Sequence, residues 1–284
     1  MTDNGVKIDG IAAVTGAGQG IGLALTVEFA RRGIDVLATV PEESMGAAVR
    51  EHTAGLPGSV ELAVLDVTKP GDFAFPDELR IVVNNAGIRL AYLPIEMTPE
   101  DQWRAVFDVN FFGLVEVTRR AIPVLRKAGT GVICNISSGS LFVPIPFLGP
   151  YRASKAAVSN LCETLRVELA PFGIRIVDIM PGATVSGINA DSIAAGHVAD
   201  AVRFPEYAPM AHRQRELNSE IPPATPAADA AVAIVDAILD GGGPMRYGTD
   251  AVSNQLLEML RTTSEEEIAV EVLRRFGVSG PAGR

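Results

Sequence analysis

The chain has 284 residues, of which 48% are hydrophobic and 20% are charged, a composition typical of folded rather than disordered proteins. Its formal net charge of −10 at pH 7 argues against a nucleic-acid partner, since domains that bind nucleic acids are normally basic, and against adsorption to an anionic membrane. The first residues lack the pattern of a signal peptide and no apolar run approaches the ~20 residues of a membrane span, so we expect a cytoplasmic protein without an integral membrane segment.

Short β-branched runs alternate with longer helical patterns along the chain. This alternation predicts an α/β fold, a single Rossmann-type, doubly wound parallel sheet with helices on both faces. Most of the runs are apolar throughout, which is typical of strands covered on both sides. The expected strands are residues 11–14, 36–40, 60–65, 81–84, 131–136 and 175–180, with a short last strand near 245–247.

Two long helices are expected, at about residues 98–126 and 150–170. At the start of the first, Thr98 is a candidate cap and Pro99 suits the first helical position. Asp101 follows three residues after Thr98 and supports the same helix start.

The connections between elements depart from a regular alternation at two places. Between residues 66 and 81 there is too little chain for a full crossover helix, and Pro70, Gly71 and Pro76 interrupt it, so we expect a truncated or missing helix. The segment at about 184–226 is long and Pro-rich, and we interpret it as an irregular, substrate-covering loop. A helical tail is expected at about 250–278, and the whole chain, 1–284, is expected to form one domain.

The cysteines and histidines give no sign of a metal site. Cys134 and Cys162 lie in apolar segments far from any CxxC pair, so we expect two buried, reduced thiols. The three histidines are scattered along the chain, and no bound metal is expected.

A glycine-rich turn follows the first predicted strand and opens a helix. Its glycines allow the backbone to turn tightly and to approach a pyrophosphate, whose charge the helix N-terminus attracts. This placement between strand and helix predicts dinucleotide binding. The candidate cofactor-binding residues of the turn are Gly16, Gly18, Gln19, Gly20, Ile21 and Gly22.

The end of the second predicted strand should select the dinucleotide. Val40 is not a carboxylate that could bind a ribose 2′-hydroxyl, and Pro41 is not an arginine that could bind a 2′-phosphate. Glu42 and Glu43 would repel a 2′-phosphate if they face the site, which favours NAD over NADP. They could instead cap the next helix and face water, so the choice between NAD and NADP stays open.

Tyr151 and Lys155 are spaced four residues apart, which places them on one helix face. A phenol has a pKa of about 10, and a nearby ammonium group lowers it by stabilising the phenolate. The pair therefore suits general acid–base chemistry on an alcohol or ketone. Just upstream, the strand at 131–136 ends in Ser137 and Ser138, at the sheet edge where ligands bind in this architecture, although both could be plain turn or cap serines.

Taken together, these motifs resemble those of classical short-chain dehydrogenases/reductases. The resemblance covers about residues 8–186, while the ending is similar to that of hydroxysteroid and retinol dehydrogenases. The shorter connection after Asp66 and the residues at Val40 and Pro41 depart from the family pattern. The motifs that carry the resemblance are the TGxxxGxG turn, Asp66-Val67, Asn84-Asn85-Ala86-Gly87, Asn110, Ser138, Tyr151-x-x-x-Lys155 and Pro181-Gly182.

The resemblance implies a role for each matching residue. Tyr151 would donate and accept the proton, and Ser138 would hydrogen-bond the reacting oxygen. Lys155 would hold the nicotinamide ribose and lower the pKa of Tyr151, while Asn110 would hold a water that links Lys155 to solvent. Asp66 and Val67 would bracket the adenine, and Pro181, Gly182, Thr184 and Val185 would lie at the nicotinamide. The other residues implied to contact the cofactor, besides the glycine-rich turn, Tyr151 and Lys155, are Val40, Asn84, Asn85, Ala86 and Gly87. Singly, Asp66, the 84–87 motif or Asn110 could be ordinary turn or helix residues.

The resemblance also implies the activity. We expect an NAD(P)-dependent oxidoreductase that transfers hydride between a nicotinamide cofactor and a bulky, hydrophobic secondary alcohol or ketone. The alternative is a catalytically silent dinucleotide-binding sensor with the same fold. An extended-branch epimerase and an enoyl reductase are disfavoured by the glycine spacing and by the Tyr–Lys spacing. The two long helices would build a homodimer or homotetramer, as they do in similar proteins.

Overall fold

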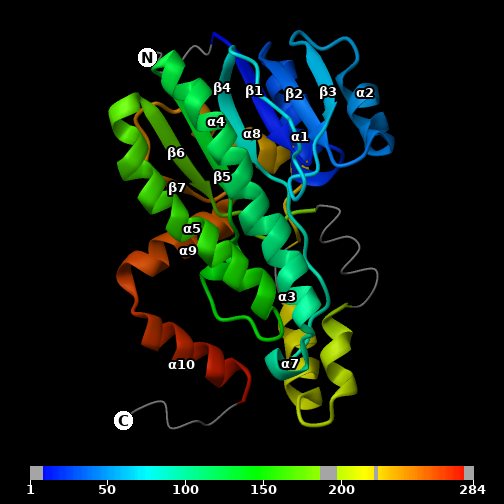
Figure 1. The fold of residues 1–284 in the computed structure, drawn as a ribbon. Helices are drawn as coiled ribbons and strands as arrows, with labels where there is room; N and C mark the ends of the chain where they lie inside the picture. The colour runs from blue at the N-terminus through cyan, green and yellow to red at the C-terminus, as the bar shows by residue number, and fades with distance from the viewer. Residues whose placement is uncertain (1–8, 186–196, 221–222, 278–284) are drawn as a thin grey trace.

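Among the residues that the computed structural model describes (9–185, 197–220 and 223–277), seven strands form one central parallel sheet. Their order is β3-β2-β1-β4-β5-β6-β7, so the chain starts in the middle of the sheet and winds outward to both edges (Figure 1). Every neighbouring pair is parallel, which confirms the predicted doubly wound sheet. The strands are β1 (Ile11–Thr15), β2 (Asp35–Val40), β3 (Val60–Val64), β4 (Leu79–Asn84), β5 (Gly131–Ile136), β6 (Ile174–Ile179) and β7 (Arg246–Tyr247).

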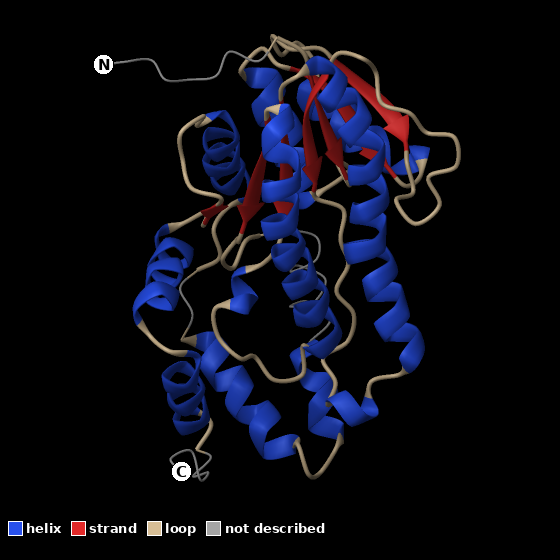
Figure 2. Ribbon diagram, turned by 60° about the vertical axis from the view of Figure 1, so that its left-hand side comes forward, coloured by secondary structure: helices blue, strands red, loops and turns tan. Residues whose placement is uncertain are grey.

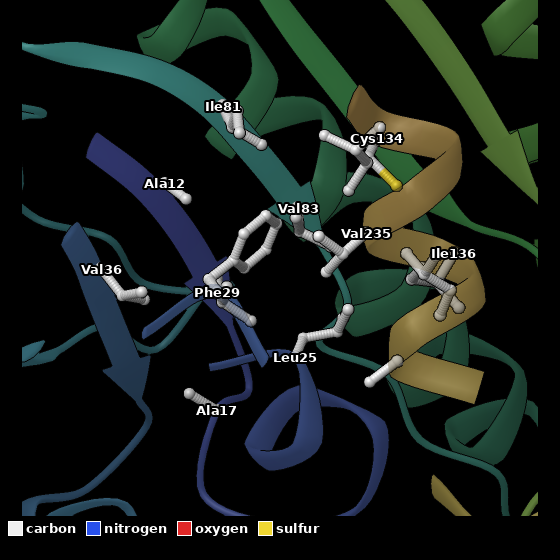
Figure 3. Close-up of a cluster of buried hydrophobic side chains, with 14 of the residues drawn as sticks. Ala12, Ala17, Leu25, Phe29, Val36, Ile81, Val83, Cys134, Ile136 and Val235 are labelled. Carbon is white, nitrogen blue, oxygen red and sulfur yellow. The ribbon is translucent and has the colours of Figure 1, made fainter. Parts of the chain in front are cut away.

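Helices cover both faces of the sheet because both faces are apolar. On one face, Leu25 and Phe29 of α1 meet Val235 of α8 over the strands, as the close-up in Figure 3 shows. On the other face, Leu125 of α4 and Leu165 of α5 lie in a second buried cluster. The main covering helices are α1 (Gly20–Arg31), α8 (Ala227–Leu239), α4 (Leu114–Ala128) and α5 (Gly149–Leu169), and the short η1 (Glu43–Gly46) and α2 (Ala47–Thr53) follow β2.

The connection between β3 and β4 contains no helix over its described residues 65–78, as predicted. Two phenylalanines take over part of the covering role: the rings of Phe73 and Phe75 meet edge to face at 5.2 Å, and Phe75 is buried in the core. Arg120 of α4 holds this loop by donating to the carbonyl oxygens of Phe73 (2.7 Å) and Gly71 (3.0 Å). The loop is therefore a fixed part of the sheet's covering layer.

The predicted helix at 98–126 is interrupted. It consists of α3 (Glu100–Phe107), a π-helical turn η3 (Asp108–Gly113) and α4, which ends at Ala128 and is followed by the C-cap residue Gly129. The expected cap at Thr98 was wrong, because its hydroxyl donates instead to the carbonyl oxygen of Pro94, in the turn that precedes η2 (Ile95–Met97). The hydrophobic pattern could not show the π turn, which shifts the helical register by only one residue.

The segment predicted as an irregular loop at about 184–226 is helical in most of its described part. It contains η6 (His197–Arg203) and α7 (Ala208–Ser219), and Pro209 lies in the first turn of α7, where proline starts a helix rather than breaking it. The remainder of this prediction falls on 186–196 and 221–222, outside the described residues. The region of the expected helical tail contains α9 (Ala251–Thr262) and α10 (Glu265–Arg275), each opened by a capping box.

The helices α3, α7, α9 and α10 lie beyond one end of the sheet, as Figures 1 and 2 both show. The chain reaches this end after leaving β4 and β5, so it is the end at the strands' carboxyl termini. Each helix in the described part of the chain is too short or too polar to cross a lipid bilayer. The described residues also contain no group of side chains that could hold a metal ion, and both cysteines are buried free thiols, as expected.

Candidate active site

The glycine-rich turn and the motif after β4 are bonded into one structure at the carboxyl ends of β1 and β4. The hydroxyl of Thr15 accepts hydrogen bonds from the backbone N–H groups of Asn85 and Ala86, each at 3.0 Å. The side chain of Asn85 donates back to the carbonyl oxygens of Thr15 (2.9 Å) and Gly16 (3.2 Å). These two predicted cofactor segments are therefore brought together.

The turn itself has no room for larger residues. Gly16 has a φ of +65°, and a Cβ there would lie 3.0 Å from the Cα of Ala86. A Cβ on Gly22 would lie 2.2 Å from the carbonyl oxygen of Gly16. Helix α1 begins directly after Gln19, so the first N–H groups of this helix are available to an anion such as a pyrophosphate.

The catalytic candidates on α5 face the ends of the strands. Lys155 is 4% exposed, and its Nζ donates to the carbonyl oxygen of Ile136 at 2.7 Å, at the end of β5. The same Nζ lies 5.9 Å from the centre of the Tyr151 ring, one helical turn earlier. A Cβ on Gly87 would lie 3.4 Å from Lys155 Nζ and 3.3 Å from Asn110 Oδ1, which shows that these three residues converge.

Asn110 lies in the π turn and is fully buried. Its Oδ1 accepts from the N–H of Ile88 (2.8 Å), and its Nδ2 donates to the carbonyl oxygen of Ile88 (3.0 Å) and to Ser154 Oγ (3.0 Å). Asn110 thus joins the chain after β4 to the residue beside Lys155. The bound water that the family resemblance assigns to Asn110 stays a prediction.

Ser138 is a cap residue that also contacts Tyr151, and its hydrogen bond to the reacting oxygen stays a prediction. Its Oγ accepts from the N–H of Ser140 at 3.1 Å and so caps η4 (Gly139–Leu141), and the same side chain hydrogen-bonds Tyr151. Ser137 points elsewhere, because its Oγ donates to Asp178. Of the two serines, only Ser138 contacts the candidate acid–base residue.

Burial sets the proton affinities of the pair. Burial raises the pKa of Tyr151, while the hydrogen bond with Ser138 and the positive charge of Arg89 oppose this rise. Burial lowers the pKa of Lys155 to about 8, while the negative charge of Asp178 opposes this fall. In this structure the effect that we expected from Lys155 on the pKa of Tyr151 therefore comes from Ser138 and Arg89.

Arg89 is a residue of the site that the sequence analysis missed. Its guanidinium lies 5.9 Å from the centre of the Tyr151 ring and 5.2 Å from that of Tyr92. The sequence did contain a signal: Arg89 comes two residues after the 84–87 motif, which ends a central strand at the ligand-binding edge.

A small hollow lies beside Tyr151. Apolar residues make up most of its wall, and Arg89 and Gln102 are its other polar members besides Tyr151. Next to it, Tyr92 and Phe147 pack with Ala211 of α7 in a separate apolar cluster. The apolar wall residues are Leu90, Ala91, Val106, Leu148 and Pro150.

The residues expected around the adenine lie at the ends of β2 and β3. Val40 is fully buried, and a Cβ on Gly18 would lie 3.3 Å from it. Asp66 accepts hydrogen bonds from the N–H (2.9 Å) and hydroxyl (2.7 Å) of Thr68, so it forms the turn that we had considered as its alternative role. Val67 is buried and packs against Gly113, and the adenine contacts of these residues stay predictions.

The acidic pair after β2 is exposed. Glu42 precedes η1 but makes no capping hydrogen bond with its side chain, and Glu43 pairs with Arg50 at 3.3 Å. The interpretation of these residues as helix caps is therefore wrong for Glu42.

The segment expected near the nicotinamide follows β6. Its Pro181 carbonyl oxygen accepts from the N–H of Gly139 at 2.7 Å, which places it directly beside Ser138. A Cβ on Gly182 would lie 2.5 Å from Asp250, so the N-terminus of α9 closes on this segment. Thr184 is buried and Val185 is exposed. Asn84, by contrast, is turned into the sheet, where it donates to Asn135 (2.8 Å).

Comparisons with known proteins agree with this geometry. The family model described as short chain dehydrogenase matches residues 10–195. Human 11-beta-hydroxysteroid dehydrogenase type 2 is 35% identical over 179 residues, which cover 60% of this chain and 44% of that protein. Cyclopentanol dehydrogenase from Comamonas testosteroni is 30% identical over 221 residues, covering 75% of this chain and 88% of that one. One similar solved structure is a crystal structure from Beutenbergia cavernae, of a protein assigned as an NAD(P)-dependent gluconate 5-dehydrogenase with bound NADP. It aligns with a TM-score of 0.71 at 26% identity, and the alignment covers 86% of this chain and 96% of that chain.

Proposed function

This chain belongs to the short-chain dehydrogenase family, and from that premise we propose that it transfers hydride between a nicotinamide cofactor and a secondary alcohol or ketone. The observation that carries the proposal is the cluster of Ser138, Tyr151 and Lys155 at the carboxyl edge of the sheet, beside the glycine-rich turn. An alcohol dehydrogenase needs a proton donor and acceptor next to a dinucleotide site, and this cluster provides one.

The shape of the turn fits a dinucleotide. Gly16 and Gly22 pack so closely against the backbone of Ala86 and Gly16 that only glycine allows this tight turn, and the N-terminus of α1 that follows it would hold the pyrophosphate. Lys155 would bind the ribose hydroxyls next to the nicotinamide. The nicotinamide would supply or accept the hydride.

The chain's own residues handle the proton. In the reducing direction, Ser138 and Tyr151 hydrogen-bond the carbonyl oxygen, and Tyr151 donates its phenolic proton as the carbon takes up the hydride. In the oxidising direction, Tyr151 accepts the alcohol proton. The positive charge of Arg89 and the hydrogen bond with Ser138 stabilise the phenolate in both directions.

The preferred cofactor in our proposal is NAD. Glu42 and Glu43 give the end of β2 a negative charge, which would repel a 2′-phosphate. The NADP bound to the solved relative gives this preference no support.

The preferred substrate is bulky and hydrophobic. The small hollow beside Tyr151 supports the hydrophobic character but not the size, since most of its lining residues are apolar, and α7 adds an apolar cluster of Tyr92, Phe147 and Ala211 next to it. The names of the two curated relatives, a steroid dehydrogenase and a cyclopentanol dehydrogenase, support an apolar ring-containing alcohol. The silent sensor gains no support, because Asn110, Ser138, Tyr151 and Lys155 are all present.

We also propose that the protein forms a homodimer or homotetramer through α4 and α5. Phe112 in the π turn before α4 is 57% exposed and Val167 of α5 is 75% exposed, an arrangement that supports a contact between copies. The cytoplasmic location stays a prediction from the sequence.

Turnover of a panel of hydrophobic ketones of graded size, followed by nicotinamide fluorescence with NADH and with NADPH, tests the proposed activity. We expect Tyr151→Phe to lower turnover by about 10²- to 10⁴-fold while cofactor binding persists. Tyr247→Phe is the matched control. It makes the same change on the edge strand β7, where the phenol donates to Asp240, and it should have no such effect. Turnover that survives Tyr151→Phe contradicts the proton role, and cofactor binding without turnover of any ketone by the unmodified protein favours the silent sensor.

A further inference from the structure

A single buried carboxylate connects three elements around the site. Asp178 of β6 is fully buried and accepts hydrogen bonds from Ser137 Oγ (2.5 Å), Ser159 Oγ (2.6 Å) and Arg246 Nε (3.3 Å). These partners come from the end of β5, from α5 and from β7. A carboxylate buried this deeply is costly unless it is well bonded, and Asp178 meets that condition.

The partners of Asp178 stand next to the catalytic candidates. Ser137 directly precedes Ser138, and Ser159 lies one helical turn after Lys155 on the same face of α5. The same carboxylate therefore fixes the strand end that carries the hydroxyl and the helix that carries the ammonium group.

Lys155 needs a negative charge nearby. Its Nζ bonds a neutral carbonyl oxygen at Ile136, and a buried ammonium group without a counter-charge tends to lose its proton. Asp178 is the charge that acts on Lys155 to keep the proton bound.

The other titratable groups around Asp178 and Lys155 do not supply the negative charge that Asp178 provides. Arg246 on β7 is a cation, which is shared between Asp178 and Glu163 (2.6 Å). The buried thiols of Cys134 and Cys162 have raised pKa values and are neutral at pH 7. Tyr151, on the same helix face, is also neutral there because burial raises its pKa.

We propose that Asp178 is a positioning residue of the catalytic centre: it holds the ends of β5 and α5 in register and supplies the counter-charge that keeps Lys155 protonated. Its effect on Lys155 is independent of the reaction, whereas its effect on turnover rests on the proposed function. Asp178→Asn tests the charge, because asparagine keeps the shape and removes the charge. Ser159→Ala is the matched control, because it removes one hydrogen bond and leaves the charge in place.

The direct test is the titration of Lys155 by NMR of protein labelled with ¹³C at the lysine Cε. The chain has only four lysines, so the Lys155 signal is identified by its loss in Lys155→Met. We expect Lys155 to titrate near pH 8 in the unmodified protein and about one to two pH units lower in Asp178→Asn, with little change in Ser159→Ala. An unchanged titration in a folded Asp178→Asn protein overturns the proposal.

A second variant decides the question if Asp178→Asn does not fold. Arg246 is partly exposed and competes with Lys155 for the charge of Asp178, so Arg246→Gln should move the titration of Lys155 to higher pH. A titration that stays in place or moves to lower pH in Arg246→Gln contradicts the proposal.

The kinetic test applies once turnover of a ketone has been found. The loss of reductase activity at alkaline pH should begin at lower pH in Asp178→Asn, and at higher pH in Arg246→Gln. If Asp178 had a purely structural role, Asp178→Asn would lower the rate at every pH without changing the pH at which activity is lost. That result would contradict the charge role. Absence of turnover in the unmodified protein would refute the proposed function but leave the NMR result decisive for Asp178.

Discussion

The guanidinium of Arg89 and the Nζ of Lys155 each lie 5.9 Å from the centre of the Tyr151 ring. One cation comes from the connection after β4 and the other from the same helix as the tyrosine. Lys155 belongs to the Tyr151-x-x-x-Lys155 motif that the sequence analysis used, whereas Arg89 belongs to no such motif. Two basic side chains from different parts of the chain therefore lie equally close to the ring of the acid–base candidate.

Removing the charge of Arg89 should make Tyr151 harder to deprotonate. A positive charge lowers the pKa of a phenol, so Arg89→Leu raises it and should move the rise of alcohol oxidation with pH upward by about one pH unit. At pH 7 we expect oxidation about tenfold slower. Arg89→Lys keeps the charge and serves as the control. Identical pH profiles for Arg89→Leu and the unmodified enzyme would exclude this role.

Lys155 should lower the free energy of unfolding of the protein at neutral pH. Its pKa falls from 10.5 to about 8 on folding, so between these values the unfolded chain binds more protons and the contribution of Lys155 to the free energy of unfolding rises with pH. Lys155→Met should therefore be more stable than the unmodified protein by about 3 kcal/mol at pH 7 and by less than about 1 kcal/mol at pH 10. Urea unfolding of both proteins at the two pH values measures the difference. A gap that does not narrow with pH would refute the prediction.

Asn110 should be costly to replace, because it bonds a backbone N–H, a backbone carbonyl and a serine in the protein interior. We expect Asn110→Ala to lower the free energy of unfolding by about 2–3 kcal/mol. Asn254 provides a matched control: it accepts one bond from the N–H of Gly248 at the surface, so Asn254→Ala should cost under about 1 kcal/mol. Equal losses in the two variants would show that burial of Asn110 is unimportant.

The charges after β2 should discriminate between the two cofactors. We expect NADH to bind more tightly than NADPH, and the double change Glu42→Gln and Glu43→Gln to strengthen NADPH binding about fivefold without affecting NADH. Fluorescence titration with each cofactor measures both affinities. Glu51→Gln, at an exposed acid of α2, is the control. A preference of the unmodified protein for NADPH would show that the acids do not face the cofactor.

The exposed apolar residues near α4 and α5 should lie in an interface. Phe112→Glu and Val167→Glu are expected to convert a dimer or tetramer into monomers at micromolar concentration, as measured by sedimentation velocity. Val64 on the edge strand β3 is 54% exposed, close to Phe112 in exposure, so Val64→Glu is the matched control. A monomeric unmodified protein would contradict the proposed assembly.

The sheet could be predicted because most of its strands are continuous apolar runs in the sequence. The absence of a helix between β3 and β4 could be predicted from Pro70, Gly71 and Pro76. The two phenylalanines that replace this helix were not predicted, since nothing in local sequence shows that Phe75 reaches the core. The helix α7 was missed because the prolines of the 184–226 segment were interpreted as a sign of an irregular loop, while Pro209 in the first helical turn favours a helix.

In the site, motif spacing located the catalytic candidates but not their electrostatics. Arg89, in the connection after β4, and Asp178, on β6, act on Tyr151 and Lys155 over sequence distances that no local pattern joins. The predicted cap at Thr98 was wrong because Pro99, not Thr98, directly precedes α3, and the Thr98 hydroxyl donates to the carbonyl oxygen of Pro94.

The wide turn at Asp108–Gly113 suggests a way to separate shape from chemistry. A π-helical turn accommodates one extra residue within nearly the same total rotation as a regular helix, so deleting one residue from this turn would restore α-helical winding, leave the flanking helices nearly in place and shift the side chains of the turn itself. Asn110 would swing away from Ile88 and Ser154 without any loss of its amide. The activity and stability of such a deletion variant would measure how much the extra residue of the π turn contributes to the orientation of the Asn110 side chain. A side-chain substitution cannot isolate this contribution.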